Sequence, residues 1–375
     1  MKKYIVSITF MLVFLFIFTD TLNAIETDDV YKYQYEKYGV EKIDNAVPEA
    51  AKDFAEDQIL QIQHAGELFD FKQILTWIFQ TFMNLLFEKK SMFIQLAALL
   101  ILMYIVKTLC SGLSSSKTVE VLNYFAVICA SVMIFSSVFS VSKNLVSTFE
   151  QLSSFSAVAL PVLTGLVGAS GLPLTAVGLS GTTVFILDVL AFIGGVCIVP
   201  IVNTYMALGL GACLTDNENL KSISKFCKNV CIFIITLLFC IFIGVVSLQS
   251  ILSNSSDSLS KRAIMFTTGN FIPVAGGYIS EGVNIVFSCA SALKGTVGAF
   301  SAAILFFTVA APITDIIVNL FILGMARMFC DFFDNKKLTA LFDVVKDAFS
   351  MMLSVTIGIV FMLIVCMTVM AKIGG

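Results

Sequence analysis

The stretch Ala159-Leu160-Pro161-Val162 lies in an apolar, glycine-rich region, and Phe271-Ile272-Pro273-Val274 repeats its pattern 112 residues later (273 minus 161). The same offset relates three pairs of residues: Pro161 with Pro273, Gly165 with Gly277, and Pro200 with Pro312. Because the hydropathy around these positions repeats as well, we predict an internal duplication. Duplicated membrane units with interrupted hydrophobic segments often build a path through the bilayer.

Composition sets the class of protein. The chain has 375 residues, of which 58% are hydrophobic and 13% are charged, and its mean hydropathy is +0.94. A soluble domain has about half apolar and about a quarter charged residues. Since backbone groups in lipid must be satisfied within each helix, we predict an all-α polytopic membrane protein with about six to eight transmembrane segments.

The membrane domain is predicted to span residues 91–375. Its apolar segments fall at 91–109, 120–142, 155–179, 183–213, 229–252, 264–290, 297–325 and 347–371. Two of them, 155–179 and 264–290, carry prolines and glycines at a density that favours broken helices. The predicted repeats are about 120–215 and 229–330, each with one spanning helix, one broken segment and one long helix.

The topology depends on whether the broken segments cross the membrane or turn back. If they cross, the second repeat is inverted; if they turn back, the two repeats are parallel. With an external mature N-terminus, the turned-back arrangement places nine basic residues inside and seven outside, whereas crossing places eight on each side. The positive-inside rule therefore favours re-entrant segments and parallel repeats.

The N-terminal part has the pattern of an exported segment. Residues 1–24 combine a basic start, an apolar run and a small-residue end, which is typical of a signal peptide. Residues 25–90 then form an acidic extracytoplasmic segment, and its part 71–87 has the periodicity of an amphipathic helix lying in the membrane interface. A helix packed on its own soluble domain is the alternative for 71–87.

Several classes of function are disfavoured. His64 is the single histidine and lies in a charged stretch, and the sequence has no phosphate-binding glycine loop, so we expect neither an enzyme nor a cofactor. The ten cysteines lie in or beside apolar stretches, which suits helix packing better than a metal site. No basic stripe with interleaved aromatics indicates nucleic-acid binding.

The remaining candidates are polar residues at bilayer depth. Asn203 and Asp315 occupy equivalent repeat positions, three residues after Pro200 and Pro312. An ionisable group at this depth costs about 2.5–3.5 kcal/mol, so it usually faces water or a partner. We therefore expect a polar path lined by Asn203, Asp315, Asp188 and Glu281. The alternative is structural: hydrogen bonds between helices, or helix ends that lie nearer the surface.

The stretch from Lys261 to Gly277 (Lys-Arg-Ala-Ile-Met-Phe-Thr-Thr-Gly-Asn-Phe-Ile-Pro-Val-Ala-Gly-Gly) resembles the stage III sporulation protein AE family of endospore-forming bacteria. The Ala159–Leu163 stretch, the N-terminal signal and the acidic segment are similar as well. The resemblance implies a subunit of a channel or secretion-like complex in the mother-cell membrane around the forespore.

The same resemblance implies the partners: other proteins of the stage III sporulation operon, a SpoIIQ-containing complex, a YidC-like insertase that assists assembly, and membrane lipids. It implies no catalytic or ligand residue. Two other functions remain open from the sequence. One is a scaffold for that complex without a conduction path, and the other is a stand-alone secondary transporter.

Overall fold

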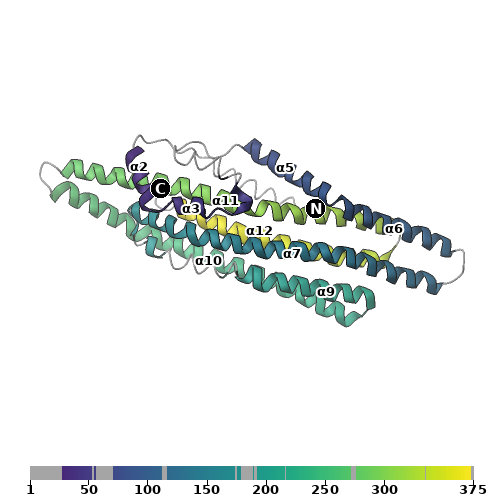
Figure 1. Cartoon of the computed structure of the whole chain (residues 1–375). Coiled ribbons are helices and arrows are strands. Elements are labelled where there is room, and N and C mark those ends of the chain that lie inside the picture. The colour runs from purple at the N-terminus through teal and green to yellow at the C-terminus, as the bar shows by residue number, and fades with distance from the viewer. Residues whose placement is uncertain are drawn as a thin grey trace.

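The computed structural model describes residues 28–52, 55, 71–111, 116–173, 175–178, 189, 192–215, 217–271, 276–333 and 335–372. Within these ranges the chain is almost entirely helical and contains no strand. The long helices run side by side in one elongated bundle, and the short N-terminal helices pack at one end of it (Figure 1). The all-α prediction is confirmed.

The elements follow one another along the chain as a series of helices of very different length. They are α2 (Asp28–Lys37), α3 (Glu41–Asn45), the 3₁₀ turn η2 (Glu49–Ala51), α5 (Phe71–Glu88), α6 (Lys90–Ser111), α7 (Ser116–Ala169), the π-helical turn η3 (Ile193–Ile198), α9 (Val199–Thr215), α10 (Glu218–Phe271), α11 (Gly276–Phe332) and α12 (Lys336–Lys372).

In the described part, six stretches are long and apolar enough to cross a membrane: 90–109, 121–169, 193–215, 218–245, 284–332 and 336–372. Four helices, α7, α10, α11 and α12, exceed what one crossing needs. At ~1.5 Å per residue, the 54 residues of α7 extend over about 81 Å, whereas the hydrocarbon core is about 30 Å thick. Parts of these helices must therefore lie beyond the lipid core or be covered by protein.

The expected helix breaks at Pro161 and Gly165 are wrong. Helix α7 continues through both residues and ends at Ala169, and the chain then turns at Gly171, whose φ of 90° favours glycine. Pro312 likewise lies inside α11. Hydroxyl groups support the helix near each proline: Thr164 donates to the Leu160 carbonyl and Thr314 to the Ala310 carbonyl, each at 2.7 Å.

The re-entrant arrangement is also corrected. Residues 155–169 extend α7 in a straight line instead of turning back, and 264–290 is divided between the end of α10 and the start of α11, which lie antiparallel (Figure 1). Pro273 lies outside the described residues. Each predicted repeat thus contributes one long helix in each direction, α7 with α9 and α10 with α11. This order suits parallel repeats, and the duplication itself stays a prediction.

Three helix pairs turn at the same end of the bundle: α6 with α7, α9 with α10, and α11 with α12 (Figure 1). Two hydrogen bonds connect the first pair with the third. Asn335 Nδ2 donates to Asn123 Oδ1 at 3.2 Å, and Lys107 Nζ donates to the Phe333 carbonyl at 3.3 Å. We call this the turn end of the bundle.

Helix α12 lies at the centre, in contact with α7, α9, α10 and α11. Most of its side chains are buried. The closest approach is to Gly298 of α11, where an added Cβ would overlap the Cβ of Ala371 and lie 3.4 Å from its Cα. Small residues allow membrane helices to pack this closely.

The described N-terminal segment packs on the end of the bundle opposite the turn end. Gln34 Nε2 donates to the Val286 carbonyl of α11 at 3.0 Å, and the Tyr38 ring lies 3.2 Å from where a Cβ of Gly165 would stand. Tyr35 donates from its hydroxyl to Asp44 at 2.7 Å. Burial raises the pKa of the Asp44 carboxyl above its usual value, although this hydrogen bond acts in the opposite direction.

A polar groove between α5, α7 and α11

The exposed face of α7 changes character halfway along the helix. From Val121 to Phe139, large apolar side chains are exposed at intervals of three or four residues: Val121, Phe125, Ile128, Val132, Phe135 and Phe139. This stripe covers 18 residue steps, or ~27 Å at ~1.5 Å each. The next exposed positions on this half of α7 include Lys143, Asn144, Ser147, Glu150 and Ser154. A polar stripe at this spacing needs water or a polar partner.

Asn144 and Ser147 of the polar stripe line a cavity of about 470 Å³ between three helices. The cavity is lined by Thr81, Asn84, Leu85 and Glu88 of α5, by Asn144, Ser147, Thr148 and Gln151 of α7, and by Ala311, Pro312 and Asp315 of α11. Most of these side chains are polar, which is unusual in a chain of this hydropathy. We call the cavity the polar groove.

Asp315 is held by a lysine from outside the predicted repeats. Lys89, at the junction of α5 and α6, donates to Asp315 Oδ1 and forms an ion pair with it. The side chains of Lys89 and Asp315 are 20% and 15% exposed. Asn319, one turn further along α11, donates to the same Oδ1 at 3.2 Å and accepts a hydrogen bond from Ser137 of α7 at 2.9 Å. A chain of polar contacts therefore joins α5, α11 and α7.

Close contacts show which parts of the other helices lie at the same position along the bundle axis as the groove. Phe149 follows Thr148 of the groove and lies 3.5 Å from where a Cβ of Gly194 would stand; that Cβ would also overlap Ile359 of α12. Next to Ile359, a Cβ at Gly358 would lie 2.9 Å from Phe239 of α10. On α10, Phe233, Leu237 and Ile241 are exposed around this position. The polar groove is thus level with an apolar surface on α10.

Asn203 lies apart from the groove. Its Oδ1 accepts a hydrogen bond of 2.8 Å from Ser142 of α7, which is buried against α9 and α12. Asn203 does not line the groove. Both matched repeat positions therefore carry polar groups that bond between helices, but the structure does not bring them into one cavity. The sequence repeat alone does not predict this separation.

The other predicted positions are distributed more widely. Pro200 is the second residue of α9, directly after the π-helical turn, and Gly277 is the second residue of α11. Asp188 lies outside the described residues. Glu281 lies in α11, within a stretch whose side chains fall outside the description. Of all the predicted site residues, Asp315 and Pro312 line the groove.

Comparison with known proteins assigns the chain to a family. The sequence profile described as Stage III sporulation protein AE matches residues 55–374. This chain belongs to that family. It is 24% identical over 229 residues to the stage III sporulation protein AE of Bacillus subtilis (strain 168), covering 61% of this chain and 57% of that protein. The chain therefore spans less than two thirds of the length of this relative, and no solved structure matches it.

Membership in the stage III sporulation protein AE family implies a role in sporulation, and the apolar helices indicate a multi-pass membrane protein. Within the described ranges, no three His, Cys, Asp or Glu side chains gather in a way that could hold a metal ion. The groove can offer hydrogen bonds and charges to water or to a polar partner.

Sequence reasoning missed most of the groove. It assigned 143–154 to a connection between two spans, so the polar residues there were not considered as a helix face. The spacing of Asn144, Ser147, Thr148 and Gln151, by three, one and three residues, could have revealed it. No sequence pattern pairs Lys89 with a residue 226 positions later.

Proposed function

We propose that this chain is an integral membrane subunit of the sporulation complex that links the mother cell with the forespore, and that the polar groove belongs to its path. The observation that carries the proposal is the position of the groove along the bundle, relative to the apolar surface of α10. Polar side chains of three helices meet at a level where α10 exposes apolar side chains. Polar groups at bilayer depth usually face water or a partner.

The membrane is that of the mother cell around the forespore, with the mature N-terminus after residues 1–24 on the extracytoplasmic side. The distribution of charge at the turn end supports this orientation. Its described basic residues are Lys107, Lys221, Lys225, Lys228, Arg327, Lys336, Lys337 and Lys346. The positive-inside rule assigns such an end to the cytoplasm, and the segment at 28–52 packs at the opposite end.

The partners in this proposal are the other proteins of the stage III sporulation operon and a SpoIIQ-containing complex, and a YidC-like insertase assists membrane assembly. Family membership supports the first group. The acidic segment is the part that would meet extracytoplasmic partners. The membrane-interface position of α5 belongs to the same proposal, in which α5 lies along α11 with Trp77 edge-on to Phe307 at 5.2 Å.

A scaffold without a conduction path is the second candidate, and one observation favours it. The bond from Ser142 to Asn203, the bond from Ser137 to Asn319 and the ion pair of Lys89 with Asp315 each tie two helices together. In this reading the polar residues fix helix packing, and the groove is a recess filled by another subunit.

Cysteine accessibility tests the path. In a variant without its ten native cysteines that still forms spores, Ser147→Cys places a thiol in the groove and Ser142→Cys places one five residues away in a buried contact. If the groove is hydrated, a small charged thiosulfonate should modify the first and spare the second. Protection of both thiols in a sporulating strain would contradict the path. Modification of the first in the free protein, followed by protection in the assembled complex, would support the scaffold.

A further inference from the structure

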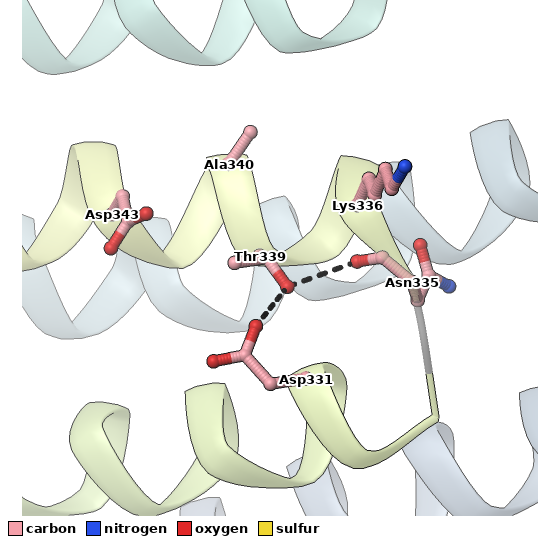
Figure 2. A pocket seen from close by; sticks show the side chains of 6 residues that line it. All are labelled: Asp331, Asn335, Lys336, Thr339, Ala340 and Asp343. Atoms are coloured by element: carbon pink, nitrogen blue, oxygen red, sulfur yellow. Dashed lines mark hydrogen bonds between the residues drawn. The ribbon is translucent and has the colours of Figure 1, made fainter.

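A second cavity lies at the turn end, between the last turn of α11 and the first turns of α12. It has a volume of about 400 Å³ and is lined by Asp331, Asn335, Lys336, Thr339, Ala340 and Asp343. Figure 2 shows these side chains around the connection between the two helices. Its size falls within the range of about 300–1,000 Å³ that is typical of small-molecule sites.

The walls of this cavity are held in place by hydrogen bonds. Thr339 donates from its hydroxyl to Asp331 at 3.1 Å, so the two helices are joined across the cavity (Figure 2). Asn335 caps α12 by accepting from the Leu338 amide at 3.3 Å, and its side-chain amide donates to Asn123 of α7 at 3.2 Å. The polar groups of the cavity are therefore positioned before any ligand enters.

The charges of the cavity are mixed. Lys336 supplies an ammonium group, and Asp331 and Asp343 supply carboxylates. Asp343 is ion-paired with Arg327 at 3.0 Å, whereas Asp331 accepts the Thr339 hydroxyl on one oxygen and directs the other away from it (Figure 2). Among the described residues, neither Lys336 nor the second oxygen of Asp331 has an ion-pair partner, so one cationic and one anionic group can meet a ligand that carries both charges.

The cavity borders an apolar surface. Met328 and Phe332, in the last turn of α11, are 73% and 81% exposed. In a membrane protein, large apolar side chains with such exposure face acyl chains, and basic residues cluster where headgroups lie. A ligand with a charged head and an apolar tail can occupy the cavity and this surface together.

We propose that this cavity binds the headgroup of a zwitterionic aminophospholipid such as phosphatidylethanolamine. Lys336 donates hydrogen bonds to the phosphate, and Asp331 accepts hydrogen bonds from the primary ammonium. The glycerol headgroup of phosphatidylglycerol has no cation for Asp331. The trimethylammonium of phosphatidylcholine has no N–H to donate. The site is separate from the polar groove and does not depend on the proposed function.

Native mass spectrometry of the full chain in detergent tests this assignment. The probes are the dioctanoyl forms of phosphatidylethanolamine, phosphatidylglycerol and phosphatidylcholine, together with free phosphoethanolamine. We expect phosphatidylethanolamine to bind more tightly than the other two lipids. Because exposed ion pairs contribute modestly, Asp331→Asn and Lys336→Gln should each weaken its binding by about two- to fivefold. Lys225→Gln, which removes an exposed lysine outside the cavity, should leave it unchanged.

Each alternative result overturns a part of the proposal. Equal or stronger binding of phosphatidylglycerol would show that net positive charge, and not the mixed pair, selects the lipid. Binding of phosphoethanolamine as tight as that of the lipid would indicate a site for a soluble phosphoester. An Asp331→Asn variant that keeps full preference for phosphatidylethanolamine, with unchanged thermal stability, would exclude Asp331 as the ammonium acceptor.

Discussion

Neutralising the ion pair of Lys89 and Asp315 separates the two candidate functions. Asp315→Asn keeps an oxygen for the hydrogen bond from Asn319 but leaves Lys89 without its counter-charge. Removing one partner of a buried pair costs about 3–5 kcal/mol, whereas replacing both is often close to neutral. Since these side chains are 20% and 15% exposed, we expect a cost at or below the lower limit of that range, about 2–3 kcal/mol, for Asp315→Asn or Lys89→Met alone.

The double variant, Lys89→Met with Asp315→Asn, should return to within about 1 kcal/mol of the parent. With each single variant costing about 2–3 kcal/mol, the coupling energy is then at least about 3 kcal/mol. The free energy of unfolding of all four proteins can be measured in mixed micelles of mild detergent and SDS. Heat-resistant spore counts at matched protein level then report function. A scaffold predicts that the double variant restores sporulation along with stability. A path that needs the charge of Asp315 predicts restored stability with lost sporulation.

Two results would refute this reasoning. A coupling energy below about 0.5 kcal/mol would mean that the ion pair does not hold α5 against α11, because neighbours that interact show larger coupling. A double variant that is as unstable as either single variant would mean that the ion pair is net stabilising and that replacing both partners is not neutral, so stability and sporulation could not be separated in this way.

Three further predictions concern packing, pH and the helix interior. Gly298→Ala should lower the free energy of unfolding by about 1–3 kcal/mol in the same micelle assay, because its Cβ would overlap Ala371. Gly324→Ala, whose Cβ would have no atom within 4 Å, should instead raise the free energy of unfolding by up to about 1 kcal/mol. Burial raises the pKa of Asp44, so the packing of the N-terminal segment should weaken as the pH rises from the usual pKa of an aspartate through the raised pKa of Asp44. Hydrogen exchange of residues 28–52 should show this pH dependence, and Asp44→Asn should remove it. Pro161→Ala should stabilise α7, by up to about 3 kcal/mol, and leave spore counts unchanged, since the helix already continues through this exposed position; a loss of sporulation would restore a role for a break there.

The sequence predicts the class of protein well, but it does not predict which apolar stretches join into one continuous helix. Hydropathy predicts where apolar helices lie because lipid leaves few other backbone structures. It does not tell whether two apolar stretches form one helix, and residues 120–142 and 155–169 do so in α7. The polar residues between them suggested a loop. A polar stripe on one face, with buried Leu145, Phe149 and Leu152 on the other, is compatible with an uninterrupted helix.

Proline density was a misleading signal for a related reason. Proline in the interior of an isolated helix costs about 3 kcal/mol. In this bundle the residues around Pro161 and Pro312 are held by neighbouring helices, and buried side chains such as Leu160 and Ile316 flank the two sites. The break occurs instead at Gly171, where a positive φ is required. Local propensity therefore indicated the right segment and the wrong residue.

The matched pair of Asn203 and Asp315 shows what an internal repeat leaves undetermined. If the two halves arose by duplication, the equivalent positions began with equivalent surroundings, yet Asn203 meets the neutral hydroxyl of Ser142 and Asp315 meets the ammonium of Lys89. The difference comes from the junction of α5 and α6, which precedes both predicted repeats and supplies Lys89 to Asp315 of α11, although α6 also packs against α7. A carboxylate in the second half is therefore tolerable because a segment outside the repeat supplies its counter-charge. This dependence couples the N-terminal region to the groove, so that any movement of α5 relative to α11 must break or carry with it the contact at Asp315.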